Sequence, residues 1–197
     1  YKRQVNYNLF FKIILKYTRR FLTFRTNFFR ITDSVNNFFN FKKFIKQPNV
    51  KLFKEKVVSI IKEKNDINLE KIFFRLKSEN NNLLKIDIEG NEYEIIDKII
   101  EFQSSIEMLI VEFHWINKNK TLFKNSIKQL KEKFEIIHIH ANNYIEPKDS
   151  DYFFDVVEIS FVRKSNLVSY ENNFRYQFPL ENLDQECFEH HPKIEFS

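Results

Sequence analysis

The sequence predicts an α/β fold whose sheet is mostly parallel and ends in a C-terminal antiparallel strand. From Val50 onward, short apolar runs alternate with amphipathic helical patterns, and strands that alternate with helices pair in parallel through right-handed crossovers. The last two apolar runs are separated only by a loop, 142–155, which favours an antiparallel pair. A hydrophobic share of 43% in 197 residues suffices for one domain with a packed core, with or without an appendage.

The first elements of this fold are expected between a boundary at Pro48 and residue 102. Residues 51–60 (KLFKEKVVSI) are typical of an edge strand or a strand pair, and 71–76 (KIFFRL) of a short helical element. Residues 83–88 (LLKIDI) form a compact apolar run that predicts a buried strand. The helical spacing of 92–102 (EYEIIDKIIEF) then predicts a helix.

The remaining strands are predicted at 106–115 (IEMLIVEFHW), 134–141 (FEIIHIHA) and 156–164 (VVEISFVRK), because each run is rich in β-branched and aromatic residues. Residues 118–134 predict a helix between the first two of these strands. Its expected inward-facing residues are Leu122, Ile127, Leu130 and Phe134.

Residues 1–46 are predicted to form a basic amphipathic helical segment, an insertion or appendage, ahead of a domain that spans 47–197. Apolar side chains in 7–31 are spaced three and four apart, which places them on one face of a helix. Residues 32–46 are expected to continue as a short helix or a loop. The apolar face consists of Phe10, Ile14, Tyr17, Phe21, Phe24, Phe28 and Ile31.

The charge of the chain is divided between these two regions. Residues 1–46 hold eleven Lys and Arg against one acid, Asp33, and carry +10, whereas the rest of the chain carries −5. Charged side chains interrupt the apolar face of 7–31 too often for a membrane span. The favoured interpretation is that this helix packs on the domain or on a protein partner. Peripheral contact with an anionic membrane surface is the alternative, and nucleic-acid contact is the least favoured.

The glycine and cysteine counts exclude several kinds of site. Gly90 is the single glycine, so these 197 residues contain no P-loop, no G-x-G-x-x-G loop and no D-x-G-x-x-x-G loop. The single cysteine, Cys187, cannot form an intramolecular disulfide, and the expected compartment is therefore the cytoplasm, with peripheral membrane attachment if 7–31 binds lipid. Because the chain begins at Tyr1, we also expect a fragment.

Polar side chains gather at the ends of three predicted strands, although a core strand has no packing reason to end in charges. In open α/β sheets, ligands bind beyond the carboxyl ends of the strands, and adjacent parallel strands would bring these ends to one rim. Period-two alternation places the polar residues of each strand end on one side. The sequence therefore predicts a shared site. Its candidate residues are Asp87 and Glu89, then Glu112 and His114, then His138, His140, Asn142 and Asn143.

Each of these residues also has a purely structural interpretation. Asp87 or Glu89 is placed to cap the following helix, whose first turn is acidic. Glu112 is placed to pair with Lys85 of the neighbouring strand. For His138, a hydrogen-bonded position within its strand is favoured over a role as a ligand.

Several segments resemble the FkbM-like family of methyltransferases. LLKIDIEGNEYEII (83–96) resembles the family signature K-[IV]-D-[IV]-E-G-x-E-x-x-[VIL], and MLIVEFHW (108–115) resembles the strand that follows it. HIHANNY (138–144), the VVEISFVRK run and the tail 178–197 resemble one subgroup, which commonly has glycine where this chain has Ala141.

The resemblance implies the C-terminal part of a Rossmann-like class I domain that uses S-adenosylmethionine to methylate a hydroxyl of a sugar or another small metabolite. A base such as His114 or His140 would take the hydroxyl proton. Alternatively, a divalent metal on Asp87, with Glu112 or His114, would acidify the hydroxyl. The implied catalytic residues are Asp87, Glu112, His114 and His140, and the implied substrate-binding residues are Glu89, Glu92, Asn142 and Asn143.

Two hypotheses follow, because the glycine-rich cofactor loop and the acidic second-strand end of the family are absent from these residues. In the first, the chain is the substrate side of a methyltransferase, inactive alone and functional with an upstream segment that carries the loop. In the second, it is a degenerate, non-catalytic module that docks a membrane surface or a protein partner through its basic N-terminal helix, with binding that weakens in salt.

Overall fold

A computed structural model describes residues 28–76, 82–143 and 155–167, together with Leu180 and Asp184. The chain divides into two compact units, Tyr1–Lys54 and Glu55–Ser197. Most of the helix predicted at 7–31 lies outside the described residues, as do Cys187 and the tail that resembles the subgroup.

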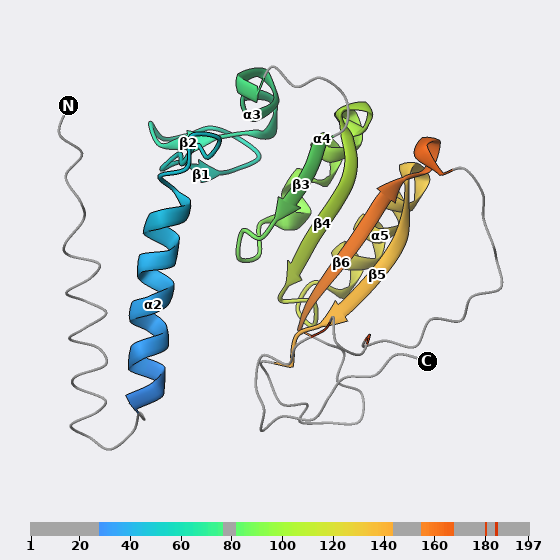
Figure 1. Cartoon of the computed structure of the whole chain (residues 1–197). Coiled ribbons are helices and arrows are strands. Elements are labelled where there is room, and N and C mark those ends of the chain that lie inside the picture. Colours follow the sequence, from blue (N-terminus) through green and yellow to red (C-terminus); the bar gives the residue numbers. More distant parts are fainter. Residues whose placement is uncertain (1–27, 77–81, 144–154, 168–179, 181–183, 185–197) are drawn as a thin grey trace. The chain divides into compact units, whose positions relative to one another are not determined.

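The first unit contains helix α2, Phe28–Phe44, so that most of 32–46 is helical (Figure 1). Two lysines, Lys42 and Lys43, stand in its last turn, where positive charge is favoured by the helix dipole. The ammonium of Lys42 also lies 5.5 Å from the centre of the Phe38 ring. Among the described helices of the chain, none combines the length and the apolar character needed to cross a membrane.

The second unit begins with a small parallel pair of strands, β1 (Lys56–Val57) and β2 (Asp66–Ile67), followed by helix α3 (Leu69–Leu76). The strand expected over 51–60 is therefore reduced to two residues. Its charged and apolar side chains do not form a continuous face that a sheet could bury. The short helical element expected at 71–76 is confirmed and starts two residues earlier.

A four-stranded sheet is the main element of the second unit (Figure 1). Its strands are β3 (Asn82–Ile86), β4 (Ile106–His114), β5 (Phe134–Ala141) and β6 (Val156–Arg163), in the spatial order β3-β4-β6-β5. β3 and β4 are parallel, and β6 is antiparallel to both β4 and β5. The predicted antiparallel final strand is thus confirmed, and β3, β4 and β5 all run in one direction.

The position of β6 corrects one expectation. The strand ends of the candidate site were expected on three adjacent parallel strands, but β6 lies between β4 and β5. A short loop requires only that β5 and β6 are neighbours and does not determine on which side of β5 the last strand lies. With β6 in the middle, the edge of β4 that faces away from β3 is hydrogen-bonded along seven residue pairs.

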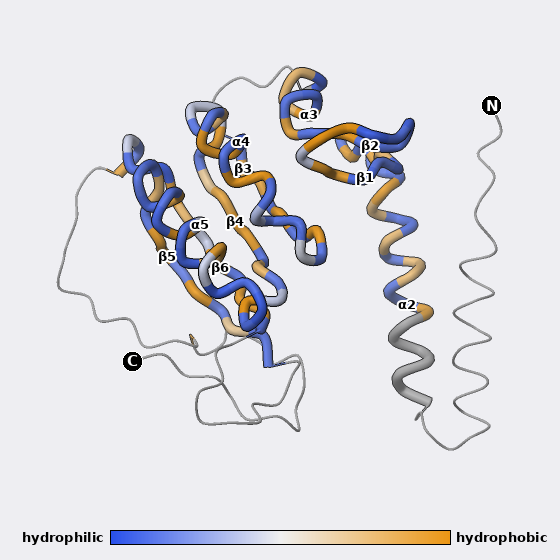
Figure 2. Tube along the Cα trace, turned by 180° about the vertical axis from the view of Figure 1, so that it is seen from behind, coloured by the Kyte–Doolittle hydropathy of each residue, from blue (hydrophilic) through white to orange (hydrophobic). Residues whose placement is uncertain are grey.

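Five helices follow the strands of the sheet in the described residues. After β3 come the 3₁₀ helix η1 (Glu92–Ile95), α4 (Ile96–Glu101) and the 3₁₀ helix η2 (Gln103–Ser105). Helix α5 (Lys120–Lys133) follows β4, and the 3₁₀ helix η3 (Lys164–Asn166) follows β6. α4 and α5 lie on one face of the sheet, and Figure 2 shows that the outward side of α5 is hydrophilic. The predicted helix at 92–102 therefore begins with a 3₁₀ turn. The fully buried aromatic residues of the core are Phe113, Phe134 and Phe161.

The inward face of α5 differs from the predicted one at two positions. Leu122 is 51% exposed, and the neighbouring Phe123 instead packs edge-on against Phe113, with ring centres 5.3 Å apart. Phe134 is buried as expected but is the first residue of β5. Leu130 is fully buried, and Ile127 packs against the core.

Leu130→Ala and Leu122→Ala make a matched pair on α5. We expect Leu130→Ala to lower the free energy of unfolding by roughly 2–5 kcal/mol, because it leaves a cavity in the core. Leu122→Ala should change it by less than about 0.5 kcal/mol, because that side chain is largely exposed. Urea unfolding followed by circular dichroism measures both. Equal losses would mean that the inward face of α5 is wrongly assigned.

Candidate active site

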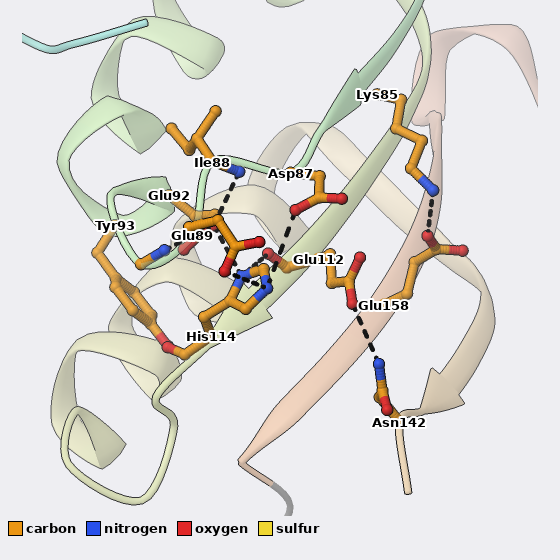
Figure 3. Close-up of polar contacts among 11 residues, drawn as sticks. Lys85, Asp87, Ile88, Glu89, Glu92, Tyr93, Glu112, His114, Asn142 and Glu158 are labelled. Atoms are coloured by element: carbon orange, nitrogen blue, oxygen red, sulfur yellow. Dashed lines mark hydrogen bonds and ion pairs between the residues drawn. The ribbon is translucent and has the colours of Figure 1, made fainter. Parts of the chain in front are cut away.

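The ends of β3 and β4 bring three potential ligand groups together. Asp87 directly follows β3, and Glu112 and His114 lie at the end of β4 (Figure 3). One ligand atom from each residue lies within 4.8 Å of the others. We refer to Asp87, Glu112 and His114 as the rim cluster. Two of the three predicted strand ends therefore meet as the sequence suggested.

The imidazole of His114 is held by contacts on its Nδ1 side. Nδ1 lies 2.9 Å from Oε1 of Glu92 and 3.1 Å from the backbone oxygen of Glu112. Both partners are acceptors, so Nδ1 carries a hydrogen and donates it. In the neutral ring, this leaves the lone pair on Nε2, which points toward Asp87 and Glu89 (Figure 3).

Glu92 has a different position from the one expected of a substrate-binding residue. Its side chain is fully buried, and Oε1 also accepts hydrogen bonds from the amides of Ile88 (3.2 Å) and Gly90 (3.1 Å). A buried carboxylate has no surface for a substrate, so Glu92 acts on His114 and on the loop instead. Glu89, by contrast, has an 81% exposed side chain that is open to a ligand.

The loop after β3 and the end of β4 are both in unusual backbone conformations. Glu89 and Trp115 have φ values of 55° and 56°, and Gly90 has a φ of 104°. A Cβ atom at Gly90 would lie 2.7 Å from Cδ1 of the Trp115 indole, which is closer than carbon atoms pack. Only glycine therefore allows the indole to lie against this loop. Non-glycine residues with positive φ cluster at functional sites.

The environment of Glu112 changes the ionisation of its carboxyl group. Burial raises the pKa of Glu112, and the nearby charge of Asp87 raises it further, while a hydrogen bond from the Asn142 amide opposes both effects. The Asn142 Nδ2 atom lies 3.4 Å from Glu112 Oε1. Glu112 does not have Lys85 as its ion-pair partner, because the ammonium of Lys85 lies 2.6 Å from Glu158 on β6.

The histidines of the third predicted strand lie apart from the rim cluster. His140 pairs in register with Glu158, and Glu158 pairs with Glu112, so two strand spacings, about 10 Å, separate β4 from β5. Nε2 of His138 lies 2.8 Å and Nδ1 of His140 lies 3.2 Å from the Asp184 carboxylate. His138 is thus a hydrogen-bonded strand residue, as favoured from the sequence.

Other predicted and unpredicted residues complete the site. Asn142 joins the end of β5 to Glu112, whereas Asn143 is buried, with 4% of its surface exposed. The sequence did not indicate Tyr93 or Asp184. The Tyr93 hydroxyl donates to the backbone oxygen of His114 over 2.8 Å, and the burial of Tyr93 raises its pKa. Neither Asp87 nor Glu89 caps the following helix, because η1 begins without a side-chain capping bond.

Comparison with known proteins identifies the family. Residues 25–145 match the family model described as the Methyltransferase FkbM domain, and this range is more than half of the chain. The chain belongs to the FkbM methyltransferase family. The match includes β3, β4 and β5 and hence the rim cluster, and it also contains the whole of α2. No curated protein and no solved structure matches the chain.

Membership in the FkbM family implies S-adenosylmethionine as the methyl donor. The single glycine of the chain does not fit a cofactor loop, because the space beside Gly90 is filled by the Trp115 indole rather than left open to a ligand. The described residues therefore provide the rim cluster but no glycine-rich cradle for the cofactor.

The close approach of Trp115 to Gly90 leads to a test by double-mutant cycle. We expect Gly90→Ala to lower the free energy of unfolding by about 1–3 kcal/mol from the positive φ alone, with a further loss from the contact with the indole. In a Trp115→Ala background the contact is absent, so the same change should cost less. Urea unfolding followed by circular dichroism provides all four values. If the losses of unfolding free energy from Gly90→Ala and Trp115→Ala were additive, the contact between the two positions would be contradicted.

Proposed function

We propose that this protein is a Rossmann-like class I O-methyltransferase in which the rim cluster receives the hydroxyl group of a small acceptor. The observation that carries the proposal is the meeting of Asp87, Glu112 and His114 at the carboxyl ends of β3 and β4, within the residues that match the FkbM family. In open α/β sheets, ligands bind at this edge. The antiparallel β6 between β4 and β5 agrees with a class I arrangement.

The acceptor is proposed to be a sugar or another small polyhydroxylated metabolite. Carboxylates accept hydrogen bonds from hydroxyl groups, and Asp87 and Glu89 both present exposed carboxylates at the rim. Trp115 is 43% exposed and directly follows His114, with the Lys118 ammonium 5.3 Å from the centre of its ring, and the exposed part of the indole is proposed to contact the carbon face of a sugar. The family assignment supplies the methyl-transfer chemistry, and these residues supply the polar and aromatic contacts.

The chemical task of the rim cluster is to orient the acceptor oxygen and to favour loss of its proton. A neutral hydroxyl is a weak nucleophile, and a positioned acid–base group typically contributes about 10²–10⁴-fold in rate. His114 is oriented for this task by Glu92, and Glu112 by Asn142. His140 lies two strands away from His114 and has no part in this step.

Asp87→Asn tests this assignment in the complete polypeptide encoded by the gene. We expect turnover, measured as S-adenosylhomocysteine formed with a panel of sugar acceptors, to fall at least about a hundredfold, because the acceptor oxygen loses a negatively charged partner. The Asp87 side chain is 44% exposed, so the folded structure should persist by circular dichroism. The matched control is Glu101→Gln, an exposed carboxylate on α4 paired with Lys98. Unchanged turnover in Asp87→Asn would remove Asp87 from the site.

The cofactor side of the proposal is tested on these 197 residues alone. We propose that they hold the acceptor and that a glycine-rich segment elsewhere holds S-adenosylmethionine, because Gly90 is occupied by its contact with Trp115. Calorimetric titration of S-adenosylmethionine into this chain should give no tight binding. Micromolar binding would contradict the proposal that the cofactor needs a further segment.

The alternative function is a non-catalytic module that docks an anionic membrane surface or a protein partner. One observation favours it: Phe39, Phe41 and Phe44 of α2 are all about half exposed, and Lys42 and Lys43 lie among them. Exposed aromatic and basic side chains together suit an anionic lipid surface. Sedimentation with anionic vesicles that weakens as salt rises, together with no turnover by the complete polypeptide, would favour this alternative.

A further inference from the structure

The Nε2 atom of His114 faces negative charge without a hydrogen bond from the described residues. The side chain is 9% exposed, and the nearest carboxylate oxygens, on Asp87 and Glu89, lie 3.9 and 3.8 Å from Nε2. Both distances exceed hydrogen-bond range. Because Nδ1 already donates to Glu92, the neutral ring turns a lone pair toward two carboxylates. Within the part of the chain that the structure describes, neither Asp87 nor Glu89 forms an ion pair with a lysine or an arginine.

A positive charge would also stabilise the carboxylates of the rim. Asp87, Glu89 and Glu112 converge beside His114 (Figure 3), and like charges at this separation repel one another. The nearest lysine of β3, Lys85, is bonded to Glu158 at 2.6 Å. Among the described residues, the Glu112 carboxylate accepts one hydrogen bond, the long one of 3.4 Å from Asn142. A cation placed between these groups would satisfy the lone pair and the acids together.

We propose that Asp87, Glu112 and His114 bind one divalent metal ion. Each residue offers one ligand atom, and the three atoms lie within 4.8 Å of one another. Atoms that share one such ion lie roughly 3–4 Å apart. Nε2 of His114 and Oδ1 of Asp87 are already at this spacing, 3.9 Å, and a small side-chain movement within the cluster brings all three ligand atoms to it. Glu89 is a third carboxylate within reach of the ion through a water molecule.

The ligand set determines the class of metal. Two carboxylates and one imidazole form a mixed oxygen and nitrogen site, which suits Mn²⁺, Fe²⁺ or Zn²⁺ better than Ca²⁺ or Mg²⁺, whose ligands are oxygen atoms. Three protein ligands leave coordination positions open, as in catalytic rather than structural metal sites. Because the side chain of Asp87 is exposed, solvent and an acceptor can reach the cluster.

Glu92 is a positioning residue in this site. Metal-binding histidines usually donate their other ring N–H to a carboxylate or a carbonyl, which fixes the tautomer that presents the lone pair to the metal. Nδ1 of His114 makes both kinds of contact, with Glu92 and with the Glu112 backbone oxygen. The hydrogen bond from the Tyr93 hydroxyl to the backbone of His114 holds the strand end as well.

The role of the ion rests on the proposed function, whereas its binding does not. A divalent ion that coordinates the acceptor oxygen lowers the pKa of the hydroxyl, so that the O–H bond breaks and the proton passes to water or to the exposed carboxylate of Glu89. No electrons are transferred in this step. The resulting alkoxide is the nucleophile that methyl transfer to oxygen requires.

Binding is tested with Mn²⁺ and the 197-residue chain. The electron paramagnetic resonance signal of free Mn²⁺ disappears on binding, and we expect one ion per chain. Asp87→Asn, Glu112→Gln and His114→Gln should each weaken binding at least tenfold, and Glu92→Gln roughly 10–100-fold although Glu92 does not touch the ion. Trp115 is the single tryptophan and adjoins His114, so its fluorescence should be quenched by Mn²⁺ in the unaltered chain.

The matched control is Glu101→Gln, which removes one negative charge from an exposed position of α4. It should bind Mn²⁺ as the unaltered chain does, and circular dichroism should show that all variants are folded. Absence of bound Mn²⁺, or equal weakening in Glu101→Gln and Asp87→Asn, would overturn the proposal. Loss of binding in Glu92→Gln with a retained fold supports positioning through His114 rather than a general loss of structure.

Failure of this proposal is distinguishable from failure of the proposed function. If the complete polypeptide turns over and the chain binds no Mn²⁺, methyl transfer stands and the metal site is wrong. If Mn²⁺ binds and turnover survives removal of the ion by a chelator, the site exists but its role in activating the hydroxyl is wrong. If the chelator abolishes turnover and Mn²⁺ restores it, both parts are supported.

Discussion

The geometry of the rim depends on one buried oxygen atom, Oε1 of Glu92. It accepts hydrogen bonds from the amides of Ile88 and Gly90 and contacts Nδ1 of His114. Burial of a carboxylate costs several kcal/mol unless such bonds replace water. A single side chain thereby ties the loop after β3 to the end of β4, while no described residue bonds its second oxygen, Oε2. The relative position of Asp87 and His114 follows from this connection.

Two non-glycine residues beside Glu92 have strained backbone conformations, which the surrounding packing holds in place. Glu89, in the loop after β3, and Trp115, directly after β4, both have positive φ. Such conformations persist only where surrounding contacts determine them. The ring of Tyr93 packs 5.7 Å from that of Phe113 and reaches the backbone of His114 with its hydroxyl. Core packing and polar contacts therefore act on the same few residues at the rim.

Much of this arrangement was predictable from the sequence, for a physical reason. Strands β3 to β6 coincide with short, mostly apolar runs separated by helical patterns or a loop, and such patterns indicate where strands form. The pairing of Asp87 with Glu112 and His114 followed from their places at strand ends. Pattern alone did not determine the insertion of β6, which removed His140 from the cluster, because lateral strand order depends on tertiary packing. It also did not show that Glu92 is buried, since the burial of an acid depends on partners that only the folded loop provides.

The lateral position of β6 has a consequence for the way the domain assembles. β5 has β6 as its hydrogen-bonded neighbour in the sheet, and β6 in turn joins it to β4. Until residues 156–163 have been synthesised and inserted, β5 and one edge of β4 lack their ladders. The sheet is therefore completed from its middle, because β6 supplies the hydrogen-bonded partner of both strands. Non-local pairing of this kind slows folding and leaves such edges open to association with other chains.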